Sequence, residues 1–581
     1  DSAAASAIQW ANLPERIRVF KTVAIRIGIL FAILGILGTA SAANPGPPLR
    51  HPATSYWDRI QDAVQQGAIS EEQALVLGVT ALFAPERLPQ PFSLGQRGKC
   101  GTPVLAEAEA RWAALPAWAR TAIAAWPVAA GARNLSRADT RPSLSGPEQT
   151  LPTAHFLIHY TIAGADAVDI ADGDGNGIPD YVDTAAQAME HSRQVQVDAL
   201  GWLEPPSDEN TDPGSPLYDL YIANLSVDGL TFPEALKGDN EHSPHVVEPF
   251  ARTSYIMLHS RLSRTVLQVT AAHEYHHAIQ FGYNAAADGF DTRRWLMEGT
   301  ATWMEDQVYD DADDNVGYLP RLFAAPDRSL TDPQNYYASW LLFQYMEEHS
   351  GGQSAMREMW ERAVPLQGDF STNVIRATLQ ARGNDWGETF VSFCCANVLL
   401  IPCELTSGRL CYADALLYRD RAGHAVAEGL ISIAEGEKAY VPPDGVQPLA
   451  CDGIRILAQT GQVAASGYSP PEQADLRAAW LGHAGFVAET LPIPMRHDPV
   501  PPESDAHPSR YDHLYVLVAN VSDPSAAPLE YAPYGLMLRG TNTTPTPSPT
   551  ASPSPTATPS STPTPTPGPA WGLWLPIIGV E

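Results

Sequence analysis

The sequence predicts an α+β fold with a mixed central region, a helical N-terminal region and an all-β C-terminal region. Three observations support this prediction. Residues 151–415 alternate β-like segments with helix-like segments. Residues 56–83 carry apolar side chains at helical spacing, and residues 416–540 contain short β-like runs divided by proline and glycine. Because each pattern has its own period, the three regions are expected to form different kinds of structure.

The chain is long, acidic and able to form a sizeable core. Its 581 residues predict several domains, and 44% of them are hydrophobic. It has 36 Lys and Arg against 66 Asp and Glu, a net charge of −30 that is spread along the chain. Such a chain repels phosphate backbones, so nucleic acid is not expected as a partner.

Residues 1–43 have the features of a secretory signal peptide. Residues 27–37 form an apolar run that is short for a membrane span, and Ala40-Ser41-Ala42 offers a cleavage site after it. The run follows four basic residues, Arg16, Arg18, Lys21 and Arg26. A secreted or cell-surface protein is therefore expected; an uncleaved anchor is the alternative. A preference for arginine over lysine and abundant alanine favour a bacterial source.

Residues 44–150 are expected to be mostly helical. The helical spacing between residues 56 and 83 is interrupted at Gly67-Ala68-Ile69-Ser70, where the helix is expected to break. We interpret this region as either a propeptide or an accessory domain.

Six cysteines lie beyond the signal region, and export favours up to three disulfides among them: Cys100, Cys394, Cys395, Cys403, Cys411 and Cys451. A metal site is the alternative for the cluster of Cys394, Cys395, Cys403 and Cys411, but its spacing lacks the C-x-x-C pairs of structural zinc sites, so disulfides are expected there. Residues 98–103, with Cys100, weakly resemble the cysteine switch of metalloprotease propeptides. A disulfide between Cys100 and another cysteine is the simpler interpretation.

The central region is expected to contain strands at 155–160, 217–223 and 254–259, and helices at 264–283, 293–308 and 336–364. Ser263 precedes the first of these helices and has a side chain suited to an N-cap.

Residues 271–277 contain the pattern H-E-x-x-H. On a helix, His273 and His277 project from one face, one turn apart, so both imidazoles can bind one Zn²⁺. Glu274 beside them is then positioned to take a proton from water activated by the metal. His276 lies off this face and is expected to pack or to form a hydrogen bond.

A zinc site needs a third protein ligand. The metzincin pattern requires glycine and histidine at positions that Gln280 and Tyr283 occupy here, so that pattern fails. Residues 295–306 resemble a second helix that carries a carboxylate toward the first, and Glu298 is the best candidate for the third ligand.

Residues 273–281 and 298–303 resemble the gluzincins, which are thermolysin-like zinc peptidases. They are most similar to secreted bacterial metallopeptidases that carry H-E-x-x-H-A-I-Q-F followed by E-G-x-A-x-W. The resemblance implies a gluzincin-like catalytic domain over residues 151–415. It also implies zinc ligands and a general base: His273, His277 and Glu298, with Glu274 as the base.

The chain departs from this family at Thr302, where thermolysin has an aspartate that orients a ligand. Thr302, Glu305 and Asp306 are therefore all candidates to orient a ligand histidine.

The implied activity is that of a secreted zinc-dependent endopeptidase acting on protein or peptide substrates. Tyr336 or Tyr337 is a candidate oxyanion donor, although both are more typical of packing aromatics. An amphipathic core helix without metal would have to bury two histidines and a glutamate, which is costly. The alternatives are an inert peptidase-like surface protein that binds partners or supports structure, and a zinc hydrolase of a non-peptide bond.

Residues 172–183 have the order of oxygen side chains that a calcium loop needs, with Gly177 at its sixth position. The expected calcium ligands are Asp172, Asp174, Asn176, Ile178 through its carbonyl, Asp180 and Asp183. A structural calcium site is expected; a metal-free turn built by Asx residues and glycine is the alternative.

The C-terminal part is expected to end in a stalk. Residues 416–540 predict a β-sandwich-like accessory domain with strands near 430–433 and 513–518. Residues 541–569 are rich in Pro, Thr and Ser and predict a disordered, extended linker. Residues 570–581 form an apolar tail. Together the linker and tail suggest cell-surface attachment, although the tail is equally typical of an unspecialised terminus.

Overall fold

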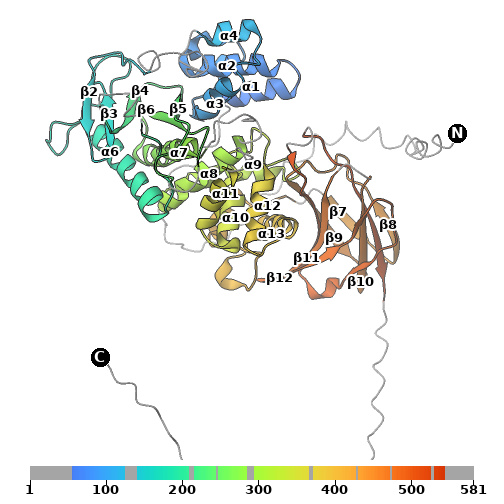
Figure 1. The fold of residues 1–581 in the computed structure, drawn as a ribbon. Helices are drawn as coiled ribbons and strands as arrows, with labels where there is room; N and C mark the ends of the chain where they lie inside the picture. Colours follow the sequence, from blue (N-terminus) through green and yellow to red (C-terminus); the bar gives the residue numbers. More distant parts are fainter. Residues whose placement is uncertain are drawn as a thin grey trace, which may run out of the picture. The chain divides into compact units, whose positions relative to one another are not determined.

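The computed structural model shows a mixed α+β fold, as predicted (Figure 1). It describes residues 55–124, 141–207, 215–243, 247–283, 294–364, 371–426, 429–470, 474–524 and 529–542. All of these belong to one compact unit, Arg50–Glu581. The predicted signal region and apolar tail, and the linker beyond residue 542, lie outside the described residues.

The N-terminal region is helical, and its first two helices begin at serine caps. α1 (Tyr56–Gln65) and α2 (Glu71–Phe83) each have a capping box, built on Ser55 and Ser70. They are separated at Gly67, whose φ of 66° ends the first helix, which confirms the predicted break. The shorter elements that follow are η3 (Pro85–Arg87), η4 (Phe92–Leu94), α3 (Thr102–Ala110) and α4 (Ala117–Ile123).

Strands between residues 98 and 259 form a six-stranded sheet. Its order is β1 (Gly98–Cys100), β5 (Val227–Leu236), β6 (Arg252–His259), β4 (Tyr218–Ala223), β3 (Phe156–Tyr160) and β2 (Gln149–Pro152). The pairs β1–β5, β3–β4 and β4–β6 are parallel, and β5–β6 and β2–β3 are antiparallel. Three of these strands, β3, β4 and β6, confirm the predicted ones. The short edge strand β1 was not predicted.

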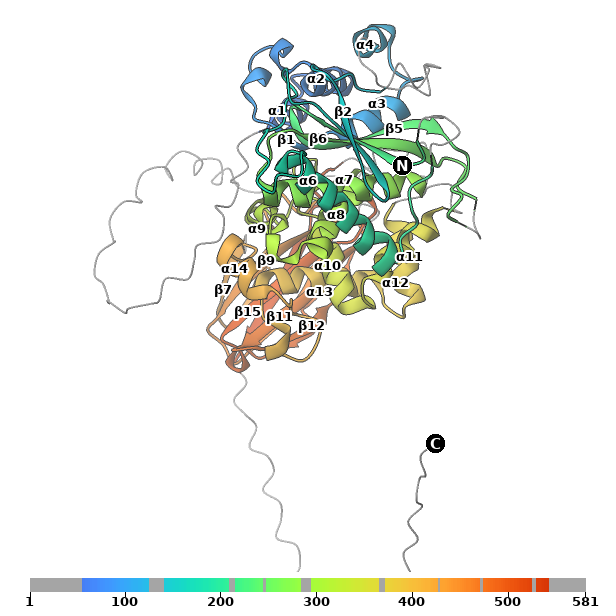
Figure 2. The same cartoon turned by 90° about the vertical axis from the view of Figure 1, so that its left-hand side faces the viewer.

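Helices pack on both faces of the sheet (Figures 1 and 2). On one face, α6 (Asp180–Arg193) and α7 (Arg264–Gly282) bury Ile158, Leu220 and Ile256 in the main core. On the other face, α2, α3 and α4 cover Leu230 and Tyr255 of the same sheet. The N-terminal helices therefore complete the core of the sheet.

The helices after the sheet follow the predictions with one correction. α8 (Arg294–Val308) is where it was expected, but the helix predicted over 336–364 is wrong as a single element. It is two helices, α10 (Trp340–Ser350) and α11 (Ser354–Ala363), because Gly351 and Gly352 have φ values of 112° and 78°. The other helices here are the π-helical η6 (Gln194–Ala199), the 3₁₀ segments η8 (Asp310–Ala312), η9 (Asn315–Tyr318) and η10 (Cys403–Leu405), and α9 (Leu319–Ala324), α12 (Thr372–Ala381), α13 (Trp386–Leu399) and α14 (Ala415–Ala422).

The C-terminal part is built from two sheets. The first has the order β12 (Val487–Ile493), β11 (Leu476–Ala484), β15 (His513–Asn520), β9 (Ala450–Ala458) and β7 (Gly429–Ile433). In the second, β10 (Gln462–Tyr468) pairs with β13 (Met495–Arg496), β14 (Ser504–Ala506) and β16 (Gly535–Thr541), and β8 (Gly436–Tyr440) lies against β16. The two sheets share one apolar core, with Ile454 and Trp480 from the first and Val463 and Leu538 from the second. The strands begin only at Gly429, after α14.

Two disulfides are present among the described residues. Cys394–Cys451 joins α13 to β9, and Cys403–Cys411 closes a short loop. Cys100 and Cys395 are free thiols. The expected disulfide of Cys100 is therefore wrong, because none of the other cysteines reaches it.

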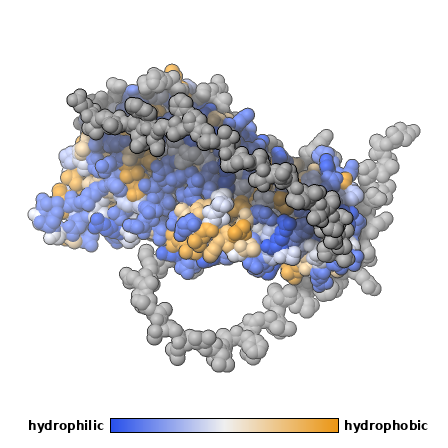
Figure 3. All heavy atoms as spheres, turned by 90° about the horizontal axis from the view of Figure 1, so that it is seen from below, coloured by the Kyte–Doolittle hydropathy of each residue, from blue (hydrophilic) through white to orange (hydrophobic). Residues whose placement is uncertain are grey.

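Among the described residues no helix is both long and apolar enough to cross a membrane. Hydrophilic residues cover most of the face drawn in Figure 3, around a smaller hydrophobic area, in keeping with the net charge of −30.

Candidate metal centre

α7 presents both histidines of the motif inside the protein. The side chain of Ser263 caps the helix by accepting the backbone N–H of Val266, as predicted. His273 and His277 are one turn apart and almost fully buried, and their Nε2 atoms lie 3.1 Å from each other. The imidazoles therefore converge on one point.

α8 packs against α7 and brings the predicted third ligand to the same point. The carboxylate oxygens of Glu298 lie 3.3 Å from Nε2 of His273 and 3.3 Å from Nε2 of His277. Glu298 is 1% exposed. The structure thus brings together the three side chains that the sequence nominated as zinc ligands.

Hydrogen bonds on the far side of each ring determine which nitrogen faces the centre. Nδ1 of His273 lies 2.7 Å from Oε1 of Glu305, and Nδ1 of His277 lies 2.7 Å from Oε1 of Gln280. The amide nitrogen of Gln280 donates to Met297 and Thr300, so its oxygen is the atom turned toward His277. Both rings therefore donate from Nδ1, and both Nε2 atoms face the centre.

Among Thr302, Glu305 and Asp306, Glu305 is the residue that forms a hydrogen bond with a candidate ligand histidine, His273. Glu305 lies two helical turns beyond Glu298, on the same face of α8. Asp306 accepts a hydrogen bond from Asn315 instead, and Thr302 is buried in α8.

The surroundings of this donor set favour positive charge at its centre. Both carboxylate oxygens of Glu298 are buried without a hydrogen-bond partner. Burial lowers the pKa of His273, but Glu298 and Glu305 outweigh that effect and raise it to about 9. Burial raises the pKa of Glu298, but the two imidazoles lower it to about 2. Two imidazole nitrogens and one carboxylate are the ligand types that Zn²⁺ takes in hydrolytic sites, so the residues present fit a zinc ion.

Glu274 is held beside this centre by two hydroxyl groups. Its Oε2 accepts hydrogen bonds from Thr102 at 3.0 Å and from Thr231 at 2.9 Å. Its Oε1 is buried without a hydrogen-bond partner. A Cβ atom at Gly229 of β5 would lie 2.7 Å from Cγ of Glu274, so the glycine makes room for this side chain. One carboxylate oxygen is therefore fixed, and the other is left for a reacting group.

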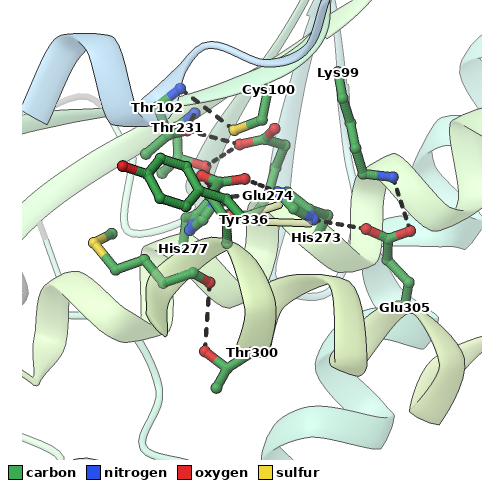
Figure 4. Close-up of polar contacts among 12 residues, drawn as sticks. Lys99, Cys100, Thr102, Thr231, His273, Glu274, His277, Thr300, Glu305 and Tyr336 are labelled. Atoms are coloured by element: carbon green, nitrogen blue, oxygen red, sulfur yellow. Dashed lines mark hydrogen bonds and ion pairs between the residues drawn. The ribbon is translucent and has the colours of Figure 1, made fainter. Parts of the chain in front are cut away.

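Three residues of the N-terminal segment also reach the centre, as Figure 4 shows. Sγ of Cys100 lies within 4.8 Å of the ligand atoms of His273, His277 and Glu298. Nζ of Lys99 forms ion pairs with Glu305 at 2.9 Å and with Asp314 at 3.1 Å. Thr102 supplies the hydroxyl group on Glu274.

The two candidate oxyanion donors are near the centre as packed aromatics. The ring of Tyr337 lies 6.2 Å from that of His273 and 5.1 Å from that of Tyr318. Burial raises the pKa of Tyr337 well above its usual range, with Glu298 adding to the effect, so its hydroxyl keeps its proton. Tyr336 lies in front of the centre in Figure 4.

His276 points away from the centre and is confirmed as a packing residue. Its Nδ1 lies 3.1 Å from Gln196, and its ring meets Trp202 edge-on at 4.7 Å. Burial lowers the pKa of His276 well below its usual value, with His277 and His273 adding to the effect, so the ring is neutral.

The predicted calcium loop lies before α6 and is exposed. Oxygen atoms of Asp172, Asp174 and Asp180 lie within 4.8 Å of one another. Asp172 also accepts the backbone N–H groups of Gly175, Asn176 and Gly177, as an Asx turn does. Asp183 accepts a hydrogen bond from the side chain of Asn176, and the N–H of Ile178 donates to Asn176. Three of the six expected ligands therefore cluster, on a turn that their own hydrogen bonds already stabilise.

Sequence reasoning missed four residues around the metal centre. Gln280 could have been found, because it is three residues after His277 and so shares its helix face. Lys99, Thr102 and Thr231 gave no such signal, because they come from segments far from the motif in the sequence.

A family profile described as "Family of unknown function (DUF6055)" matches residues 253–381. The matched segment runs from β6 to α12 and includes His273, Glu274, His277, Glu298 and Glu305, but not Cys100 or Thr102. No curated protein and no solved structure matches the chain.

Proposed function

We propose that the chain is a zinc-dependent endopeptidase. One observation carries the proposal: two imidazole nitrogens and a carboxylate, all buried, converge beside a glutamate that has one oxygen without a partner. A centre that only held a metal would not need that glutamate.

The residues of the chain divide the work of hydrolysis between them. A bound zinc ion supplies Lewis acidity at the centre. His273, His277 and Glu298 hold the ion. Oε1 of Glu274 takes the proton of the attacking water and returns it to the leaving amine, while the two hydroxyl groups on Oε2 keep the carboxylate in place.

A peptide is the substrate class that the surroundings favour. β5 runs past Glu274, and β1 pairs with it as an extended segment whose Cys100 is opposite Gly229. An edge of β5 that pairs with one extended segment can pair in the same way with an extended peptide substrate once that segment leaves.

An inert metal site is the second candidate function, and one observation favours it. Cys100 lies close enough to complete a set of four protein ligands, as in structural zinc sites. A zinc hydrolase of a non-peptide bond is a third candidate, with the same Glu274 as its base.

The function is tested by the hydrolysis of casein and of a quenched peptide, with Glu274→Gln compared against the parent chain. Both chains are measured with Cys100 intact and with Cys100→Ala. We expect zinc to be retained in Glu274→Gln and turnover to fall by about 100-fold or more, since general-base catalysis is lost. Equal turnover with and without Glu274 would contradict the peptidase, and no turnover in any zinc-loaded chain would favour the inert site.

We also propose calcium as a structural ion at Asp172, Asp174 and Asp180, supported by the clustering of their oxygen atoms. Secretion and attachment at the cell surface remain proposals that rest on the sequence of residues 1–43 and 541–581.

A further inference from the structure

Lys99, Cys100 and Thr102 each contact a different working part of the proposed centre. Lys99 pairs with Glu305, which orients His273. Cys100 lies among the ligand atoms, and Thr102 donates to the general base. One short segment therefore touches the metal ligands, their support and the base together (Figure 4).

The thiol of Cys100 is directed to the centre by its own backbone. It is a free cysteine, and its Sγ accepts the N–H of Thr102 at 3.4 Å. The unpartnered, buried oxygens of Glu298 belong to the same group of atoms. Sulfur completes with two nitrogens and one oxygen a set of four ligands that Zn²⁺ takes readily.

The backbone pairing of β1 with β5 is short. β1 has three residues, and its register with β5 pairs Gly98 with Val227 and Cys100 with Gly229. Two flanking hydrogen bonds, from Gly98 to Ser226 and from Gly101 to Gly229, have N–O distances of 3.0 Å. Release of this strand from β5 is a local opening that also breaks the two ion pairs of Lys99, while α2, α3 and α4 stay on the sheet.

We propose that Cys100 is the fourth ligand of the metal and that the strand β1 holds the enzyme latent. The latency in this inference rests on the proposed function, whereas the fourth ligand can be tested without measuring any activity. On binding, the thiol releases its proton to solvent, and the sulfur fills the position that a substrate carbonyl would need. Because β1 also fills the edge of β5, a peptide cannot add there until the strand leaves.

The ligand is tested on the full chain loaded with Co²⁺ in place of Zn²⁺. Thiolate bound to Co²⁺ gives a sulfur-to-metal charge-transfer absorption in the near ultraviolet, and X-ray absorption of the zinc form reports a zinc–sulfur distance of about 2.3 Å. We expect both signals in the parent chain and neither in Cys100→Ala. Cys395→Ala is the matched control, because Cys395 is the other free cysteine and is buried in α13 away from the centre. It should keep both signals. Absence of both from the zinc- or cobalt-loaded parent chain would overturn the inference.

Latency is tested by peptide hydrolysis in the same three chains. We expect Cys100→Ala to turn over at least about tenfold faster than the parent chain, since a site that is open in a tenth of molecules has a tenth of the activity. Cys395→Ala should match the parent. Equal turnover in all three chains, with the sulfur signals present, would overturn the proposed latency. Cys100 would then still be a metal ligand.

The two proposals fail in different ways. If the peptidase proposal is wrong, the sulfur signals persist and no chain hydrolyses peptide. If the inference is wrong, the parent chain hydrolyses peptide as fast as Cys100→Ala and lacks the sulfur signals.

Discussion

At the scale of single residues, the arrangement of the proposed metal centre depends on side chains other than the three candidate ligands. Glu305 and Gln280 hold the two imidazoles by their Nδ1 atoms, so both rings are fixed before any ion binds. Glu305 has a second role, since it also pairs with the buried Lys99. Its carboxylate therefore links the ligand His273 to the N-terminal segment.

Glu305→Gln should weaken zinc binding by about 10- to 100-fold, the usual effect of removing the partner of a ligand histidine. The amide keeps the size of the side chain but loses the charge that supports His273 and Lys99. Competition with a chromogenic chelator measures the affinity. Asp306→Asn is the matched control. The carboxylate of Asp306 follows Glu305 in the sequence, but it accepts a hydrogen bond from Asn315 and not from a candidate ligand histidine. Similar affinities in Glu305→Gln and Asp306→Asn would contradict the role of Glu305.

A buried carboxylate in the C-terminal part makes stability depend on pH. Asp452 is 1% exposed. Burial raises its pKa, the hydrogen bond from Tyr534 lowers it, and Asp327 raises it again, to about 6. The folded state therefore binds a proton more readily than the unfolded state, whose aspartate has its ordinary pKa of about 4. The contribution of protonated Asp452 to the free energy of unfolding is fully present below pH 4 and is lost as the pH rises through about 6.

Asp452→Asn should remove this dependence on pH, because the amide does not titrate. The free energy of unfolding that the parent chain loses is about 3 kcal/mol, which corresponds to a shift of two pKa units. We expect the unfolding free energy of the parent chain, measured relative to Asp452→Asn by urea titration, to fall between pH 4 and 6. Asp505→Asn, on an exposed side chain of the same part, is the control and should follow the parent chain. A parallel course of the parent chain and Asp452→Asn across this range would contradict the prediction.

At the scale of elements, local signals predicted the long helices and the central strands. The spacing of His273 and His277 fixed their common helix face, and Glu298 followed from the carboxylate on the next helix. β1 could not be predicted, because three residues with no alternation carry no strand pattern. Its position depends on pairing with β5, which lies more than a hundred residues later. The same long separation hid the roles of Lys99 and Thr102.

The loop before α6 should bind calcium and become more stable on binding. We expect the melting temperature of the chain to rise in millimolar Ca²⁺ relative to chelator, because an ion that binds only the folded state stabilises it. Asp172→Ala should abolish the rise, since Asp172 belongs to the cluster of three carboxylates. Asp169→Ala is the control, because Asp169 is exposed and outside that cluster. An unchanged melting temperature of the parent chain in Ca²⁺ would contradict the calcium site and favour the metal-free turn.

At the scale of the whole molecule, the N-terminal helices pack on the six-stranded sheet and complete its core. α2, α3 and α4 bury Leu230, Phe232 and Tyr255 on the face opposite α7. The same region supplies Cys100 to the centre on the other side. The sequence suggested a propeptide or an accessory domain; the packing favours a part that stays on the sheet.

A chain that lacks residues 44–124 should therefore aggregate. The loss of residues 44–124 would expose the apolar face of the sheet around Leu230, Phe232 and Tyr255. A contiguous exposed apolar patch of this kind promotes association. We expect aggregation on size-exclusion chromatography and strong binding of a hydrophobic dye. A chain that lacks residues 543–581 is the control and should elute as the parent does. A soluble, dye-negative and folded chain without residues 44–124 would show that the region is removable, and the release of Cys100 would then be cleavage rather than local opening.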